Sequence, residues 1–105
     1  MTEATYRSIT QQEAKKMMDS MTGYAIVDVR PPDVYAQSHI PGAINIPNPT
    51  IGDEPPAQLP SKNQTVFVYC QDGVWAKDAS SKLAKLGYTN IYEMGGFPNW
   101  PYDKT

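Results

Sequence analysis

The apolar residues of the chain fall into short runs that are separated by polar and turn-forming segments. Four runs are rich in β-branched and aromatic residues and lie at residues 24–29, 43–46, 65–69 and 91–94. Their apolar positions do not alternate regularly with polar ones. Strands of this kind are covered on both faces, which is typical of a largely parallel sheet between helices.

The segment before the first run has the pattern of an amphipathic helix. Thr10 and Glu13 have the spacing of a capping box. Ala14 and the methionines that follow it recur at helical spacing, and Gly23 provides a stop. We therefore expect a helix between Thr10 and Gly23 whose apolar stripe faces the core.

A second helix is expected between the third and fourth runs. One helical face is formed by four apolar residues, Ala76, Ala79, Leu83 and Leu86. Gly87 follows as the stop. A shorter helical stretch is expected at residues 33–39, after Pro31 and Pro32, which end the first strand because neither can donate to a strand ladder.

These elements alternate in the order β-α-β-β-α-β after the initial helix, which predicts an α/β fold. We expect three layers, α/β/α, around a central and mostly parallel sheet. The 105 residues suffice for one domain, so a single domain is expected over residues 1–105, with its core at about residues 8–101. The proline-rich residues 47–60 are expected to form an ordered loop, and residues 95–96 a turn after the last strand.

Composition narrows the classes of function. The net charge is −2 and basic residues do not cluster, so no nucleic-acid partner is expected. No apolar run approaches the roughly 20 residues of a membrane span, and the start MTEATYRS lacks a signal-peptide core, so we expect a cytoplasmic protein without a membrane partner. One cysteine and one histidine allow neither an intramolecular disulfide nor a closed zinc site built from soft ligands, so neither is expected.

The single cysteine lies in a position that favours chemistry over packing. Cys70 follows the third apolar run, and VYCQDGVW leads from that strand through a glycine-containing turn into the second helix. Gly73 permits the backbone conformation that such a turn requires. A tight loop that opens into a helix directs backbone N–H groups toward its centre, where they and the helix dipole stabilise an anion. We therefore interpret Cys70 as a candidate nucleophile.

Several motifs in one chain resemble the rhodanese-like, or sulfurtransferase, domains. In order they are DVR at residues 28–30, Tyr35, HIPGAINIP at 39–47, VYCQDG at 68–73 and LGYTNIYEMGGFPNW at 86–100, and they span nearly the whole chain. Ser38 departs from the family, which often has glycine before the histidine. The resemblance implies a parallel sheet flanked by helices, with Cys70 as the nucleophile and no cofactor.

The chemistry that the resemblance implies is transfer of sulfane sulfur through a persulfide on Cys70. The thiolate attacks the outer sulfur of a donor such as thiosulfate, and a thiol or cyanide then removes that sulfur. The expected partners are a small sulfur donor or a persulfidated partner protein, and a thiol acceptor. The residues expected to contact the substrate follow the cysteine directly: Gln71, Asp72, Gly73, Val74 and Trp75.

Residues outside the loop have expected roles as well. Asp28 and Arg30 are expected to support the site, with Asp28 either holding the active loop or pairing with Arg30. His39 is expected to shape the turn of the HIPGA motif rather than to act as a base. Trp75 either covers the mouth of the pocket or selects a protein or apolar donor. Trp100 packs the C-terminal segment onto the fold or walls the pocket.

The loop departs from the family in charge. Many members carry a basic residue directly after the cysteine and an arginine five positions after it, where this chain has Gln71 and Trp75. Asp72 adds a negative charge instead. A carboxylate about 6 Å from a unit anion costs roughly 2–3 kcal/mol at an effective dielectric constant near 20. We therefore expect the loop to disfavour thiosulfate, which is a dianion.

Two classes of function fit these residues. The first is a sulfurtransferase, favoured by Cys70 and Gly73. The second is a catalytically weak module of the same fold that binds and regulates a protein, favoured by the missing basic residues. Related cysteine phosphatases need an arginine six positions after the cysteine, where this chain has Ala76, so a phosphate clamp is not expected.

Overall fold

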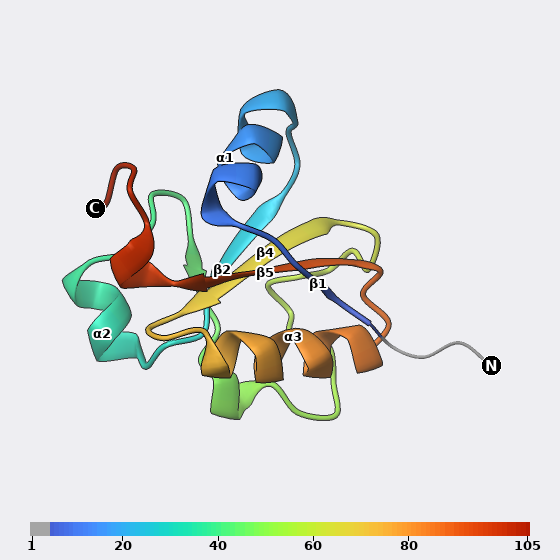
Figure 1. The fold of residues 1–105 in the computed structure, drawn as a ribbon. Helices are drawn as coiled ribbons and strands as arrows, with labels where there is room; N and C mark the ends of the chain where they lie inside the picture. Colours follow the sequence, from blue (N-terminus) through green and yellow to red (C-terminus); the bar gives the residue numbers. More distant parts are fainter. Residues whose placement is uncertain (1–4) are drawn as a thin grey trace.

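A sheet of five strands forms the centre of the protein in a computed structural model that describes residues 5–105. The strands are β1 (Arg7–Ser8), β2 (Ala25–Asp28), β3 (Ile44–Asn45), β4 (Thr65–Cys70) and β5 (Asn90–Gly96). Their order across the sheet is β1-β5-β4-β2-β3, and each neighbouring pair is parallel. The strands therefore end at one common edge (Figure 1). The predicted α/β class with a parallel sheet is confirmed.

Helices cover the two faces of this sheet. Figure 1 shows α1 (Gln11–Ser20) on one face and α3 (Val74–Lys85) on the other. α2 (Pro32–Gln37) lies beyond the carboxyl ends of the strands, at the same end of the molecule as the segment that joins β4 to α3. Two short 3-10 helices, Asn48–Thr50 and Phe97–Asn99, follow β3 and β5. The strand ends, α2 and the β4–α3 segment thus meet at one end.

The start of α1 forms as its sequence predicts. The hydroxyl of Thr10 accepts a hydrogen bond from the backbone N–H of Glu13 at 3.0 Å, and the Glu13 carboxylate accepts one from the N–H of Thr10 at 3.1 Å. Ala14 and Met18 are buried on the face that covers the sheet. The capping box and the apolar stripe together fix which side of this helix faces the core.

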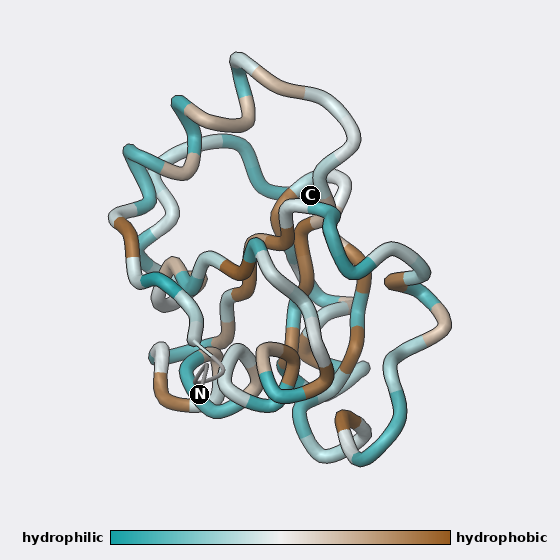
Figure 2. Tube along the Cα trace, turned by 90° about the vertical axis from the view of Figure 1, so that its right-hand side faces the viewer, coloured by the Kyte–Doolittle hydropathy of each residue, from teal (hydrophilic) through white to brown (hydrophobic). Residues whose placement is uncertain are grey.

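Two apolar clusters fill the space between the sheet and its helices. Consecutive residues of β4 point to opposite faces, so Val66 and Val68 belong to the cluster under α3, while Phe67 and Tyr69 belong to the cluster under α1. All four are fully buried. Figure 2 shows hydrophobic segments along the central strands and hydrophilic ones on the outer turns. Burial on both faces explains why the strand runs lack regular alternation.

Element bounds differ from the predicted ones by a few residues, and three differences have a clear physical reason. β1 was not predicted, because Arg7–Ser8 is too short to carry a periodic pattern and forms by pairing with β5. The turn predicted at residues 95–96 was wrong, because both glycines lie within β5. Pro32 not only follows the end of β2 but also begins α2, where a missing N–H is tolerated.

The proline-rich segment at residues 47–60 is anchored in the core. Ile51 and Leu59 are almost fully buried, and the Leu59 carbonyl accepts a hydrogen bond from the Tyr88 hydroxyl at 2.6 Å.

None of the described helices is long and apolar enough to cross a membrane. Residues 1–4, which begin the stretch MTEATYRS, lie outside the described residues.

Candidate active site around Cys70

The sulfur of Cys70 lies at the end of β4, where backbone N–H groups of the following segment point at it. Sγ accepts a hydrogen bond from the N–H of Gly73 at 2.8 Å and from the N–H of Ala76 at 3.2 Å. Gly73 has a φ of +92°, in the left-handed region that glycine adopts without strain. Two donors beside a helix N-terminus stabilise negative charge on the sulfur or on a group bound to it.

Asp72 lies closer to the sulfur than its sequence position suggested. Its Oδ1 atom is 3.7 Å from Sγ of Cys70, so the separation of about 6 Å assumed from the sequence was wrong. In the thiol form, Sγ–H can donate a hydrogen bond to this oxygen. The same oxygen accepts a hydrogen bond from the N–H of Val74, the first residue of α3, at 3.0 Å. Asp72 therefore has a structural contact as well as an electrostatic one.

The backbone of the cysteine loop packs directly against β5. A Cβ atom placed on Gly96 would lie 2.5 Å from the carbonyl oxygen of Gln71, which is closer than real side chains approach. Cys70 and Gly96 are also partners in the strand register. Only glycine fits at position 96, because the loop backbone lies so close to it. The contact with β5 thus helps to hold the cysteine loop in place.

A buried ion pair lies at the end of the neighbouring strand β2. Nε of Arg30 donates to both carboxylate oxygens of Asp28 at 3.0 Å, and Nη2 donates to Oδ2 at 2.6 Å. The side chain of Asp28 is 0% exposed and that of Arg30 is 3% exposed. Burial by itself lowers the pKa of Arg30, but the hydrogen bonds and the charge of Asp28 outweigh it and raise that pKa. The pairing predicted as one option for Asp28 is present.

The ion pair reaches the cysteine loop through Arg30. Nη1 of Arg30 donates to Oε1 of Gln71 at 3.3 Å, and Nη2 also donates to the carbonyl oxygen of Ser38 at 2.6 Å. The guanidinium carbon lies 4.3 Å from the ring centre of Phe97 and 5.6 Å from that of Tyr69. Arg30 therefore joins the ends of β2, β4 and α2 at one point.

A pocket of about 350 Å³ opens at Cys70. Its lining consists of Arg30, Pro31, Val34, Cys70, Gln71, Asp72 and Trp75. The loop itself has no basic residue, but Arg30 brings a guanidinium to the same pocket from another strand. Pro31 and Val34 were not predicted, although residues just after β2 had to lie at the edge of the sheet where β4 ends. The loop sequence alone therefore does not show the guanidinium donor that reaches this pocket.

The predicted substrate contacts divide into three groups in the structure. Gln71, Asp72 and Trp75 line the pocket, and Trp75 is 45% exposed at its rim. Gly73 approaches the sulfur through its backbone N–H. Val74 lies outside the lining and is 64% exposed, because α3 begins at this residue and directs its side chain away from the pocket.

The histidine is not part of this pocket. The ring of His39 stacks on that of Tyr35 with 3.9 Å between their centres, and Nδ1 lies 2.9 Å from the Tyr35 carbonyl oxygen. The backbone of His39 pairs with that of Thr105 in both directions at 2.9 Å. These contacts agree with the expectation that His39 shapes its turn, and they explain how it also ties down the C-terminal segment.

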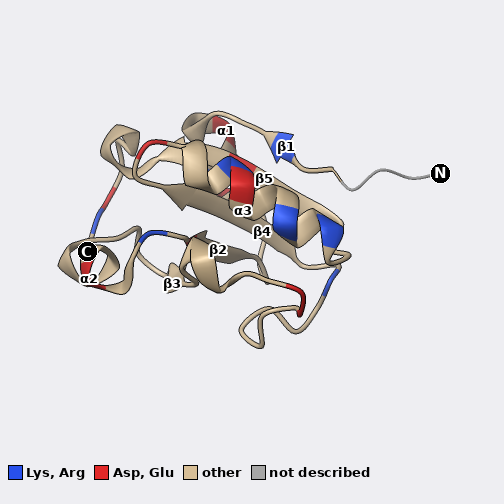
Figure 3. Cartoon of the chain, turned by 90° about the horizontal axis from the view of Figure 1, so that it is seen from below, with Lys and Arg blue, Asp and Glu red and all other residues tan. Residues whose placement is uncertain are grey.

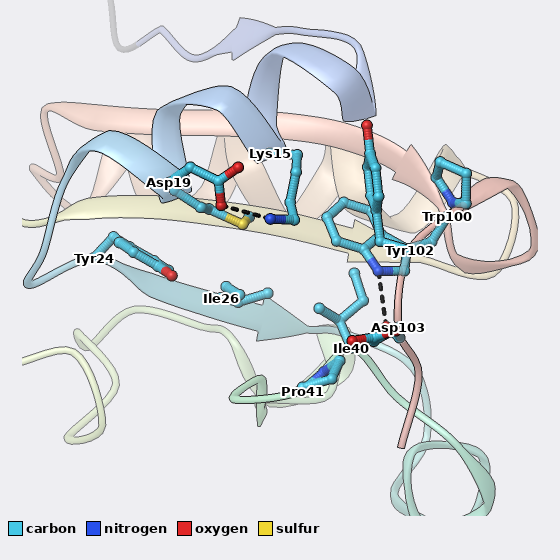
Figure 4. A pocket seen from close by; sticks show the side chains of 11 residues that line it. Lys15, Asp19, Tyr24, Ile26, Ile40, Pro41, Trp100, Tyr102 and Asp103 are labelled. Carbon is cyan, nitrogen blue, oxygen red and sulfur yellow. Dashed lines mark hydrogen bonds and ion pairs between the residues drawn. The ribbon is translucent and has the colours of Figure 1, made fainter.

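A larger cavity of about 550 Å³ lies elsewhere, between α1, β2 and the C-terminal segment. Figure 4 shows Trp100 and Tyr102 on one side of it, and Lys15 paired with Asp19 on α1. Trp100 belongs to this cavity and not to the lining at Cys70, so the idea that it walls the cysteine pocket was wrong. Among the described residues, no cluster of His, Cys, Asp and Glu could hold a metal ion at either place.

Two of the three basic side chains of α3 lie at the end of the helix that is far from the cysteine. Lys82 and Lys85 are in the last turn of the helix, and Figure 3 shows basic residues in blue at that end. Cys70 lies at the other end, where its sulfur accepts a hydrogen bond from the N–H of Ala76. Asp78, between them and the loop, pairs with Lys82 at 3.3 Å and accepts a hydrogen bond from Asn48 at 3.0 Å. Hydrogen bonding by Asn48 is the main cause that lowers the pKa of Asp78. These lysines therefore add little positive potential at the pocket.

Comparison with known proteins gives one consistent family. A family model described as a rhodanese-like domain matches residues 10–102. Thiosulfate sulfurtransferase PspE of Escherichia coli is 41% identical over 70 residues, which are 67% of this chain and 67% of that protein. Thiosulfate sulfurtransferase GlpE of Haemophilus influenzae is 31% identical over 97 residues, or 91% of this chain and 89% of that protein. A solved structure titled "rhodanese with anions from E. coli" superposes with a TM-score of 0.71 at 36% identity, covering 78% of this chain and 96% of that one.

Proposed function

The chain belongs to the family of rhodanese-like domains, and on that premise we propose that it is a sulfurtransferase that carries sulfane sulfur as a persulfide on Cys70. The observation that carries the proposal is the pair of backbone N–H groups, from Gly73 and Ala76, that bond the cysteine sulfur at the floor of a pocket. The names of the relatives PspE and GlpE support thiosulfate as one donor.

The first half of the reaction loads Cys70. The thiolate attacks the outer sulfur of the donor, a new Sγ–S bond forms, and the S–S bond of the donor breaks. For thiosulfate, the electron pair of that bond leaves with sulfite, so no external oxidant or reductant is needed. The N–H groups of Gly73 and Ala76 stabilise the attacking thiolate and then the persulfide anion.

The second half of the reaction returns the cysteine to its starting state. A thiol or cyanide attacks the outer sulfur of the persulfide, and the bond between that sulfur and Sγ breaks. The electron pair stays on Sγ, which the same two N–H groups stabilise. The acceptor leaves as a persulfide or as thiocyanate. The acceptor in this proposal is a cellular thiol, on a small molecule or on a partner protein.

The charges around the sulfur bear on which donor reacts best. The Asp72 carboxylate, 3.7 Å from Sγ, opposes both the thiolate and an incoming dianion. Its exposure to water weakens this effect, so thiosulfate is disfavoured rather than excluded. A donor with less charge at the transferred sulfur, such as a small organic persulfide or a persulfidated partner protein, avoids most of this repulsion.

Intact-mass analysis tests the proposal directly, because Cys70 is the only thiol in the chain. After exposure to thiosulfate or a small-molecule persulfide, we expect a gain of one sulfur mass that dithiothreitol removes. Cys70→Ser is the matched control and should show no such gain. If no donor produces the adduct in folded protein, the sulfurtransferase proposal fails.

A protein-binding module of the same fold is the second candidate function. Val74 and Trp75 are 64% and 45% exposed beside the pocket, and large apolar side chains at such a place favour contact with another protein. This candidate predicts that Cys70→Ser leaves partner binding intact, whereas replacing Trp75 by a small polar residue weakens it. Binding measured with both variants therefore separates the two functions.

A further inference from the structure

One nitrogen of the Arg30 guanidinium, Nη1, makes only a single long hydrogen bond within the described fold. Nε and Nη2 together donate to both oxygens of Asp28 and to the carbonyl oxygen of Ser38, at 2.6–3.0 Å. Nη1 carries two N–H groups, and its one hydrogen bond among the described residues is the longer contact to Gln71 Oε1 at 3.3 Å. Arg30 is only 3% exposed, yet it lines the pocket of Cys70. The weakly used nitrogen therefore belongs to a buried and oriented cation at the site.

The group that covers Nη1 is the one most easily moved. Gln71 is exposed and directly follows Cys70 in the loop, whereas Asp28 is 0% exposed. The hydrogen bond to the Gln71 amide has only one charged partner, and at 3.3 Å it is long. A bond from the same guanidinium to an oxyanion joins two opposite charges and is stronger. An oxyanion in the pocket can thus replace the Gln71 amide at Nη1 with a net gain.

We propose that Nη1 of Arg30 is the anion-binding group of the Cys70 pocket and that the Gln71 side chain is its displaceable cover. The ligand class is an oxyanionic sulfur compound, with thiosulfate as donor and sulfite as the product that leaves. This proposal rests on the proposed function for its biological meaning, but the binding event itself needs no reaction at the cysteine.

The surroundings of Arg30 determine over what range it attracts an anion and how strongly salt affects that attraction. Asp28 neutralises the formal charge of the guanidinium, so Arg30 attracts an anion through short, directed hydrogen bonds rather than over a long range. The Phe97 ring, 4.3 Å from the guanidinium carbon, holds the group in place, and little ordering is needed on binding. Binding at Arg30 should therefore depend only weakly on salt, unlike the repulsion by exposed Asp72.

Nuclear magnetic resonance of arginine side chains provides the test. The chain has two arginines, Arg30 and Arg7, so their Nε–H signals are readily told apart. Sulfite titrated into Cys70→Ser should shift the Arg30 signal and leave that of exposed Arg7 in place. No shift of Arg30 at saturating sulfite, or equal shifts of both arginines, would overturn the proposal.

Variants of Gln71 separate a cover from a ligand. Gln71→Ala, in the Cys70→Ser background, should lower the sulfite Kd by about threefold to tenfold, since the Gln71 amide no longer competes for Nη1 of Arg30. Gln71→Met keeps the bulk without the oxygen and should tighten binding as well. Weaker binding in both would show that Gln71 is itself the ligand, and tightening in Gln71→Ala alone would show that bulk, not the hydrogen bond, is what matters; either result contradicts the proposal.

Two readouts keep this inference apart from the proposed function. Sulfite binding in Cys70→Ser requires no persulfide, so it stands even if the mass experiment finds no sulfur transfer. In the enzyme with its cysteine, Gln71→Ala should lower the thiosulfate KM by a similar factor. An unchanged KM together with unchanged sulfite affinity would sink the inference and leave the sulfurtransferase proposal intact.

Discussion

The site around Cys70 has a buried frame and an exposed rim, and the two differ in what they determine. The frame consists of Asp28, Arg30 and Gly96, which are almost inaccessible to water. Asp28 and Arg30 pair with each other, and Gly96 lies against the backbone of the cysteine loop. The rim consists of Asp72 and Trp75, which are exposed at the mouth of the same pocket. The frame sets where the sulfur and its N–H donors lie, while the rim sets the charge and shape that a donor meets.

The contrast follows from how each region is held. A buried charge needs its partner, and a tight backbone contact leaves no room for a larger side chain. Substitution in the frame therefore leaves an unpaired buried group or a steric clash. An exposed side chain is solvated and can be exchanged with little effect on folding. Changes in the frame should therefore cost stability and activity together, whereas changes in the rim should alter donor preference in a folded protein.

Removing the negative charge of the frame should have the largest effect. Asp28→Asn leaves the Arg30 guanidinium buried without its counter-charge, and we expect a loss of about 3–5 kcal/mol in the free energy of unfolding, measured by denaturant titration. Asp33→Asn, at an exposed position of α2, is the control and should change stability by less than about 0.5 kcal/mol. A loss below about 1 kcal/mol in Asp28→Asn would show that the pair is not what holds the frame.

The close approach of β5 to the loop gives the next largest effect. In Gly96→Ala, the new methyl group meets the Gln71 carbonyl oxygen at 2.5 Å, so the loop must shift. We expect a stability loss of about 1–3 kcal/mol and at least tenfold slower persulfide formation, measured by time-resolved intact mass. Gly52→Ala is the matched control, because no atom lies within 4 Å of its Cβ position. Equal behaviour of the two variants would refute the role of Gly96.

Changing the charge of the rim should have the smallest and most selective effect. Asp72→Lys removes a repulsion near Sγ, and Trp75→Arg adds a positive charge at the mouth of the pocket. Each should raise kcat/KM for thiosulfate by about tenfold, which corresponds to about 1.4 kcal/mol, and the gain should shrink as salt rises.

An uncharged sulfur donor is the control for the rim variants. Its kcat/KM should change far less, because it has no charge for the new side chains to attract. Equal gains for both donors would indicate that the variants merely open the pocket. No gain for thiosulfate in a folded variant would mean that charge at the rim does not limit the reaction.

The parts of this protein that its sequence predicted are those governed by neighbouring residues. The apolar runs located four strands, and the spacing of Thr10 and Glu13 located the start of α1. The cysteine loop was equally local, since strand end, Gly73 and helix start follow one another within seven residues, from Cys70 to Ala76. Hydrophobic periodicity and turn chemistry act over such short distances, so they can be read without a fold.

The tertiary structure decided how distant residues contact one another at the site. Arg30 was expected near the cysteine, but only the parallel pairing of β2 with β4 brings its guanidinium to Gln71, 41 positions away in sequence. The same holds for Gly96, which the sequence suggested as a turn and which in fact lies in β5 against the loop, and for Trp100, which lies at another cavity. Such contacts depend on strand order and register, which arise from packing the whole sheet rather than from any local pattern.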